Sequence, residues 1–91
     1  MKYFDWDEEK NAELKQERNI SFEKIIIYIN DGKVIDVIDH PNKGRYHNQK
    51  IYIIAINEYV YAVPFVEDEE KYFLKTIIPS RKLTKKYLLG R

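Results

Sequence analysis

The chain has 91 residues, carries 16 Lys and Arg against 15 Asp and Glu, and contains no cysteine. The length predicts a single domain over residues 1–91, and an apolar fraction of 44% is too high for a disordered chain. Without cysteine there is no disulfide or thiolate metal site, the two histidines match no metal-ligand spacing, and no apolar run is long enough to cross a bilayer. We therefore expect a cytoplasmic protein with no leader sequence, metal or cofactor.

The formal net charge of +1 hides an asymmetry between the two ends. Residues 1–23 carry seven acids against four bases, whereas residues 71–91 carry seven bases and no acid. One interpretation is that the two ends neutralise each other in the fold. The other is that a basic C-terminal face binds a polyanion. Charge alone does not decide between them.

The first third of the chain predicts two helices. Asp5 or Asp7 can cap a helix whose first turn is acidic. Trp6, Lys10 and Leu14 share one face of it, and Asn19 is a natural stop because asparagine tolerates the left-handed conformation. Ser21 then caps "FEKIIIYIN" (22–30), whose apolar residues recur at helical spacing. "NDG" (30–32) closes this second helix.

From residue 33 the apolar pattern alternates and predicts four strands, at 33–40, 49–56, 59–67 and 71–78. In the first of these, Val34, Asp36 and Ile38 are expected on one face. Asn57 suits a tight reversal. Pro64 marks a bulge or an unpaired side, because proline has no N–H to donate to a ladder.

Pro79 is predicted to end the last strand, and Ser80 to cap a short helix over 81–89. The order predicts an α+β fold with two N-terminal helices, a four-stranded antiparallel sheet and a short C-terminal helix. The first two helices should cover one face of the sheet and leave the other partly open.

Most charged and aromatic groups permit a purely structural interpretation. Asp36 and Asp39 fall on opposite faces of a strand and do not form a carboxylate pair, and the acids at 67–70 suit a solvated turn. Tyr59 and Tyr61 share one face of their strand, where they either pack in the sheet or stack on nucleic-acid bases.

Two basic groups could instead contact phosphate. The loop after Pro41 and the start of the next strand contribute the first group: Lys43, Arg45, His47 and Lys50. This loop is either mobile surface or a phosphate-contacting lip with an imidazole that titrates near neutral pH. The second group lies in "IIPSRKLTKKY" (77–87), where Arg81 follows a strand end and Lys85 and Tyr87 lie on nearby turns. A fixed arginine there could stabilise a pentavalent phosphate, with the RNA 2′-hydroxyl as nucleophile and no metal.

An ordered set of short segments resembles the BrnT family of toxins: "FDWDEEKN" (4–11), "ISFEKI" (20–25), "RY" (45–46), "IIPSR" (77–81) and "KKY" (85–87). The resemblance implies a RelE-like ribonuclease fold and a DNA-binding antitoxin partner. Asp7 and Lys10 match the opening motif, Arg81 stands at the arginine of the family's "ISAR" segment, and Arg45 and Tyr87 lie near its loop arginine and late tyrosine. Three departures are "IPSR" for "ISAR", "ERN" (17–19) for "KHG", and Gly44 for a glutamate.

The leading hypothesis is an endoribonuclease toxin of a type II toxin–antitoxin pair, acting on mRNA without a metal. Arg81 and Arg45 would stabilise charge on phosphorus, and His47 or Tyr87 would move protons. The backbone of the RNA would be bound by lysines, namely Lys75, Lys85, Lys86, Lys50 and Lys43. Two alternatives stay open. One is a non-catalytic RNA- or protein-binding module on the same scaffold, and the other is a basic helix that only docks an acidic antitoxin segment.

Overall fold

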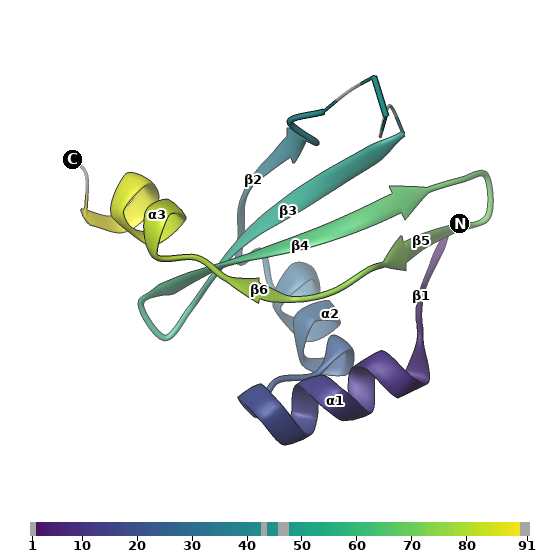
Figure 1. The fold of residues 1–91 in the computed structure, drawn as a ribbon, viewed down its shortest axis with the longest axis horizontal. Coiled ribbons are helices and arrows are strands. Elements are labelled where there is room, and N and C mark those ends of the chain that lie inside the picture. Colours follow the sequence, from purple (N-terminus) through teal and green to yellow (C-terminus); the bar gives the residue numbers. More distant parts are fainter. Residues whose placement is uncertain (1, 43, 46–47, 90–91) are drawn as a thin grey trace.

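The computed structural model describes residues 2–42, 44–45 and 48–89. The helices are α1 (Glu8–Arg18), α2 (Phe22–Asn30) and α3 (Arg81–Thr84), which continues into a π-helical turn, η1 (Lys85–Leu89). The strands are β1 (Tyr3–Trp6), β2 (Val34–Asp39), β3 (Gln49–Ile56), β4 (Tyr59–Glu67), β5 (Lys71–Leu74) and β6 (Ile78–Pro79). Helices α1 and α2 lie together on one side of the sheet, and α3 follows β6 at a corner of the molecule (Figure 1). The predicted mixed α+β class is confirmed, with differences in the arrangement of the strands.

The predicted helix boundaries are confirmed by their caps. The Asp7 side chain accepts a hydrogen bond from the Glu9 N–H at 2.9 Å, and Asn19 ends α1 in the left-handed conformation at φ 54°. The Ser21 hydroxyl accepts from the Lys24 N–H at 3.1 Å. Asn57 reverses the β3–β4 hairpin at φ 51°. These signals are local, since a side chain within three residues satisfies the exposed backbone groups at the end of the helix.

The expectation of a four-stranded, wholly antiparallel sheet is wrong at its N-terminal edge. The strands run in the order β1-β5-β4-β3-β2, and β1 pairs in parallel with β5. Residues 3–6 form this strand because Phe4 and Trp6 alternate into the core, where Trp6 stacks on Phe22 at 6.0 Å between ring centroids. The helical face expected for Trp6 is therefore a strand face, and the helix begins only after the Asp7 cap.

The predicted strand 71–78 is wrong as one continuous element, because it divides into β5 and β6. Both pieces pair with β4, at Phe65–Glu67 and at Tyr61–Ala62 respectively. Pro64 lies between them, and its carbonyl accepts from the Lys75 N–H at 2.8 Å. In an antiparallel strand the N–H and C=O of a residue point to the same neighbour, so the missing N–H of Pro64 faces the break. The unpaired side predicted for Pro64 is thus confirmed.

A bulge in β2 corrects the predicted faces of that strand. Val34 pairs with Ile54, but Asp36 pairs with Ile53, so one extra residue enters between them. Val34 packs against the core under α1 and α2, whereas Asp36 lies on the opposite face of the sheet. The bulge thereby turns a carboxylate toward the face that the C-terminal helix occupies.

The core lies between the sheet and the first two helices. Its buried members are Leu14, Ile20, Phe22, Ile25, Ile54, Ile56, Val63, Phe65, Leu74 and Ile77. One buried polar side chain, Asn11, joins the two helices: its Oδ1 accepts from the Phe22 N–H at 2.8 Å, and its Nδ2 donates to Glu23 Oε1 at 2.8 Å. This core holds the α1–α2 junction against the β3–β4 hairpin.

Candidate functional site

The C-terminal arginine selected from the sequence stands on a well-fixed support. The Ser80 hydroxyl caps α3 by accepting from the Leu83 N–H at 3.1 Å, which confirms the predicted cap. The Ser80 N–H donates to the Val60 carbonyl at 3.0 Å, and the Val60 N–H donates to Thr84 Oγ1 at 2.9 Å. Arg81 is the first residue of α3 and is exposed. The first turn of α3 is therefore bonded to β4 on both sides of Arg81, while the guanidinium reaches solvent.

Tyr87 is bound to the bulged strand. Its hydroxyl donates to Asp36 Oδ2 at 2.8 Å. This hydrogen bond, with smaller contributions from burial and from the negative charge of Asp36, raises the pKa of Tyr87 above its ordinary value. Lys86 Nζ lies 5.3 Å from the centre of the Tyr87 ring, a cation–π contact. The hydroxyl proton of Tyr87 is therefore engaged by Asp36, and the raised pKa makes the phenol a weaker acid than an unbound tyrosine.

The remaining predicted lysines are spread along the same half of the chain. Lys85 and Lys86 belong to η1, and Lys75 is exposed in the gap between β5 and β6. Lys50 is exposed on β3, opposite Asp39 of β2. The described lysines of this set therefore come from three separate parts of the chain: β3, the segment between β5 and β6, and η1.

Arg45 lies away from Arg81. It belongs to the loop between β2 and β3, where its N–H donates to Asn42 Oδ1 at 3.2 Å. That loop leads into Gln49, whereas α3 is bonded to Val60, which pairs with Ala55 at the other end of β3. The strand between Gln49 and Ala55 is about 20 Å long at about 3.3 Å per residue. Two further candidates, Lys43 and His47, lie outside the described residues.

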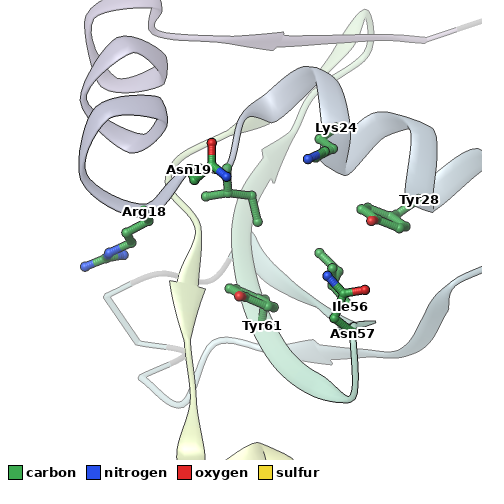
Figure 2. Close-up of a pocket in the computed structure, with 8 residues that line it drawn as sticks. Arg18, Asn19, Lys24, Tyr28, Ile56, Asn57 and Tyr61 are labelled. Carbon is green, nitrogen blue, oxygen red and sulfur yellow. The ribbon is translucent and has the colours of Figure 1, made fainter.

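A pocket that sequence reasoning missed lies at the α1–α2 junction. It has a volume of about 220 Å³, and its lining residues are Arg18, Asn19, Ile20, Lys24, Tyr28, Ile56, Asn57 and Tyr61. In Figure 2 the side chains come from the end of α1, from α2 and from the β3–β4 hairpin, with Lys24 and Tyr28 facing Tyr61 and Asn57 across the space. The residues are distant in sequence, and the fold brings them together.

Arg18 is the most firmly placed cation of this pocket. Its Nη1 donates to the carbonyl of Ile77 at 2.8 Å, which ties the end of α1 to the segment that leads into α3. Arg18 also occupies the histidine position of the "KHG" motif to which "ERN" was compared. The change from histidine to arginine in that motif was therefore one sequence signal for this pocket. Lys24 and Tyr28, four residues apart on one helix, were a second signal, because that spacing puts them on one face.

The pocket favours an anion. Its lining contains two cations and no acid. The neighbouring Glu23 is engaged elsewhere, since it accepts from Asn11 Nδ2 and pairs with Lys15 at 3.7 Å. The Asn11 hydrogen bond is the largest cause that lowers the pKa of Glu23. Within the described ranges, neither Arg18 nor Lys24 forms an ion pair with a carboxylate.

Among the described residues, no group of three or more His, Asp and Glu side chains could hold a metal ion. None of the described helices is long and apolar enough to cross a membrane.

Comparison with known proteins gives one family. Residues 6–86 match a family model described as the ribonuclease toxin, BrnT, of type II toxin–antitoxin systems. No curated protein and no solved structure matches the chain. The match covers the α1–α2 junction, strands β2 to β6, α3 and the first residues of η1, and so includes both cationic regions.

Proposed function

Because the chain belongs to the BrnT family of ribonuclease toxins of type II toxin–antitoxin systems, we propose that it is an endoribonuclease that cleaves mRNA and thereby inhibits translation. The single observation that carries this proposal is the family match over residues 6–86. The exposed arginine on a fixed support, and the tyrosine that keeps its proton, give the proposal a chemical route.

The proposed reaction is attack of the RNA 2′-hydroxyl on the adjacent phosphorus. The bond to the 5′-oxygen breaks, which leaves a 2′,3′-cyclic phosphate and a 5′-hydroxyl end. Arg81 would bind the phosphate oxygens, where negative charge grows in the transition state, and its two-pronged guanidinium suits that geometry. No metal takes part in this scheme.

Tyr87 is the proposed proton donor to the departing 5′-oxygen. Like any tyrosine it is protonated at the pH of the cell, and its hydrogen bond to Asp36 holds the hydroxyl in place. To act as the donor, Tyr87 would have to turn its proton from Asp36 to the leaving oxygen. His47 was the sequence candidate for the acceptor of the 2′-hydroxyl proton. Its described neighbours in the chain, Arg45 and Gln49, lie at the end of β3 far from α3, so we assign it no role at the phosphate that Arg81 binds.

The other cations are proposed to bind the RNA backbone. Lys85 and Lys86 flank Tyr87 on η1, and Lys75 is exposed near the break between β5 and β6. Arg45, Lys50 and Lys43 belong to the far end of β3, and we now assign Arg45 a phosphate farther along the strand instead of the one that reacts. Such contacts give affinity that falls with salt.

The partner is proposed to be a cognate antitoxin with a DNA-binding domain, acting in the cytoplasm. Neutralisation would follow if an acidic segment of that protein covered α3 and η1, where the exposed residues Arg81, Lys82, Lys85 and Lys86 gather. The antitoxin and RNA would then compete for one surface.

A non-catalytic RNA-binding module is the second candidate. It is favoured by Arg18 at the position of the motif histidine, because arginine stays charged and cannot exchange a proton near neutral pH. Gly44 in place of the expected glutamate points the same way.

The deciding experiment uses the purified full-length chain, free of its antitoxin, with a labelled RNA in the presence of EDTA. We expect cleavage, a 2′,3′-cyclic phosphate end, and no reaction at a site whose 2′-hydroxyl is replaced by hydrogen. Binding without cleavage would identify the module instead. Cleavage that stops with EDTA would overturn the metal-free scheme.

A further inference from the structure

The pocket at the α1–α2 junction is small and partly open. Its volume of about 220 Å³ is below the roughly 300–1,000 Å³ of sites that enclose a whole small molecule. Four of its lining residues, Arg18, Asn19, Lys24 and Asn57, are exposed at its rim (Figure 2). Such a space fits one unit of a longer ligand better than a separate cofactor.

The cations of the pocket indicate that the ligand carries a negatively charged group. Arg18 donates one guanidinium N–H to the Ile77 carbonyl, and in Figure 2 its head group points away from Lys24 and from the rings. Lys24 lies in the first turn of α2 with an exposed side chain. With no acid in the lining, Lys24 is the cation placed to meet a phosphate in the pocket.

The aromatic rings of the pocket indicate that the ligand also carries a flat ring. Tyr28 and Tyr61 line the pocket from α2 and β4, and both are half-buried. The Tyr59 ring packs edge-on against Tyr61 with centroids 5.8 Å apart, which holds that ring in place. Rings of this kind stack on bases of single-stranded nucleic acid, and the amides of Asn19 and Asn57 can donate and accept at a base edge.

We infer that this pocket binds one nucleotide of single-stranded RNA, with its phosphate on Lys24 and its base against Tyr28 or Tyr61. The pocket lies near the edge of the sheet that leads into α3, because Arg18 is bonded to Ile77 and Tyr61 pairs with Pro79. Asp36, which binds Tyr87, is on the opposite face of the sheet, so an RNA strand that used both regions would pass around this edge. The choice of RNA over another phosphorylated polymer rests on the proposed function.

The test measures binding apart from cleavage. A 2′-O-methylated RNA oligonucleotide cannot react, and its affinity is read by fluorescence anisotropy over a range of salt concentrations. We expect Lys24→Gln to weaken binding about tenfold and to reduce the slope of log K against log salt by about 0.7. Tyr28→Leu should weaken binding about tenfold with the slope unchanged. The matched control is Lys33→Gln, which alters an exposed lysine outside the pocket lining and outside α3 and η1, and should change affinity less than twofold.

A second measurement needs no substitution. Titration of uridine 5′-monophosphate into the wild-type chain should shift the NMR signals of Tyr28 and Tyr61. The inference is overturned if these rings do not respond, if both variants bind like the wild type, or if Lys33→Gln loses as much affinity as Lys24→Gln. The proposed function fails separately: a chain that binds RNA through the pocket but never cleaves it keeps this inference and loses that function.

Discussion

The two cationic regions of this molecule are built in opposite ways. The C-terminal cations follow one another along 75–86, on a segment fixed to β4 by Ser80 and Thr84. The pocket instead draws Arg18, Lys24 and Tyr61 from three separate elements that meet over the core. The density of charge along the sequence therefore identified the C-terminal region, but not the pocket. The comparison also separates two roles, since Arg81 on its fixed helix suits the reacting phosphate and Lys24 beside the half-buried rings suits a bound nucleotide.

Replacing Tyr87 tests the C-terminal region most severely. If Tyr87 is the proton donor, Tyr87→Phe should lower the RNA cleavage rate by about 10²–10⁴-fold, because general acids typically contribute that much. The matched control is Tyr59→Phe, which removes a hydroxyl on the other face of the sheet. Equal rates for Tyr87→Phe and the wild type would remove Tyr87 from the chemistry.

Arg81→Ala should lower the cleavage rate by about 10²–10³-fold, as expected when one group that stabilises developing charge is removed. Expression of this variant should also relieve growth arrest. The protein should stay folded, because Arg81 is exposed and the α3 support is formed by Ser80 and Thr84. A variant that remains as toxic as its parent would place the reacting phosphate elsewhere.

Asn11→Ala tests whether the Asn11 hydrogen bonds stabilise the α1–α2 junction that lines the pocket. Asn11 is 1% exposed and satisfies the buried Phe22 N–H. Leaving that donor unpaired should lower the free energy of unfolding by about 1–3 kcal/mol. Urea denaturation measures the change, and Gln16→Ala on the exposed side of the same helix serves as the control. If the two variants unfold alike, the Asn11 contacts do not secure the α1–α2 junction.

Tyr52 gives the smallest expected effect, at alkaline pH. Burial raises its pKa from 10.0 to about 12. Since the unfolded chain ionises Tyr52 first, stability due to this residue is complete below pH 10 and is lost as the pH rises toward 12. Tyr52→Phe keeps the ring that stacks on Phe65 and removes the ionisation, so its unfolding free energy should fall less steeply over that range. A slope identical to the wild type would contradict the assigned cause.

The predictable parts of the fold are those set by near neighbours. Asp7, Ser21, Ser80 and the two left-handed asparagines each act through backbone groups a few residues away, so the sequence revealed them. β1 was missed because its partner, β5, lies more than sixty residues along the chain. The break between β5 and β6 opposite Pro64 was missed for the same reason, because it depends on which neighbouring strand the missing N–H of Pro64 faces.

In the candidate site, too, the features set by near neighbours in sequence were predictable, and those that depend on distant residues were not. Ser80, Arg81 and Tyr87 are read from one continuous segment, whereas the hydrogen bond from Tyr87 to Asp36 depends on a bulge that alternation does not reveal. The pocket needs residues 18 to 61 to converge, and the sequence offered only the altered motif at Arg18 and the helical spacing of Lys24 and Tyr28.

The most direct test of the two-region account is single-turnover cleavage of one RNA by wild type, Arg81→Ala and Lys24→Gln over a range of enzyme concentrations. We predict that Arg81→Ala lowers the rate at saturation and leaves the half-saturating concentration unchanged. Lys24→Gln should instead raise that concentration about tenfold and keep the saturated rate. The account is contradicted if the wild type does not cleave the RNA, or if both substitutions change the same parameter.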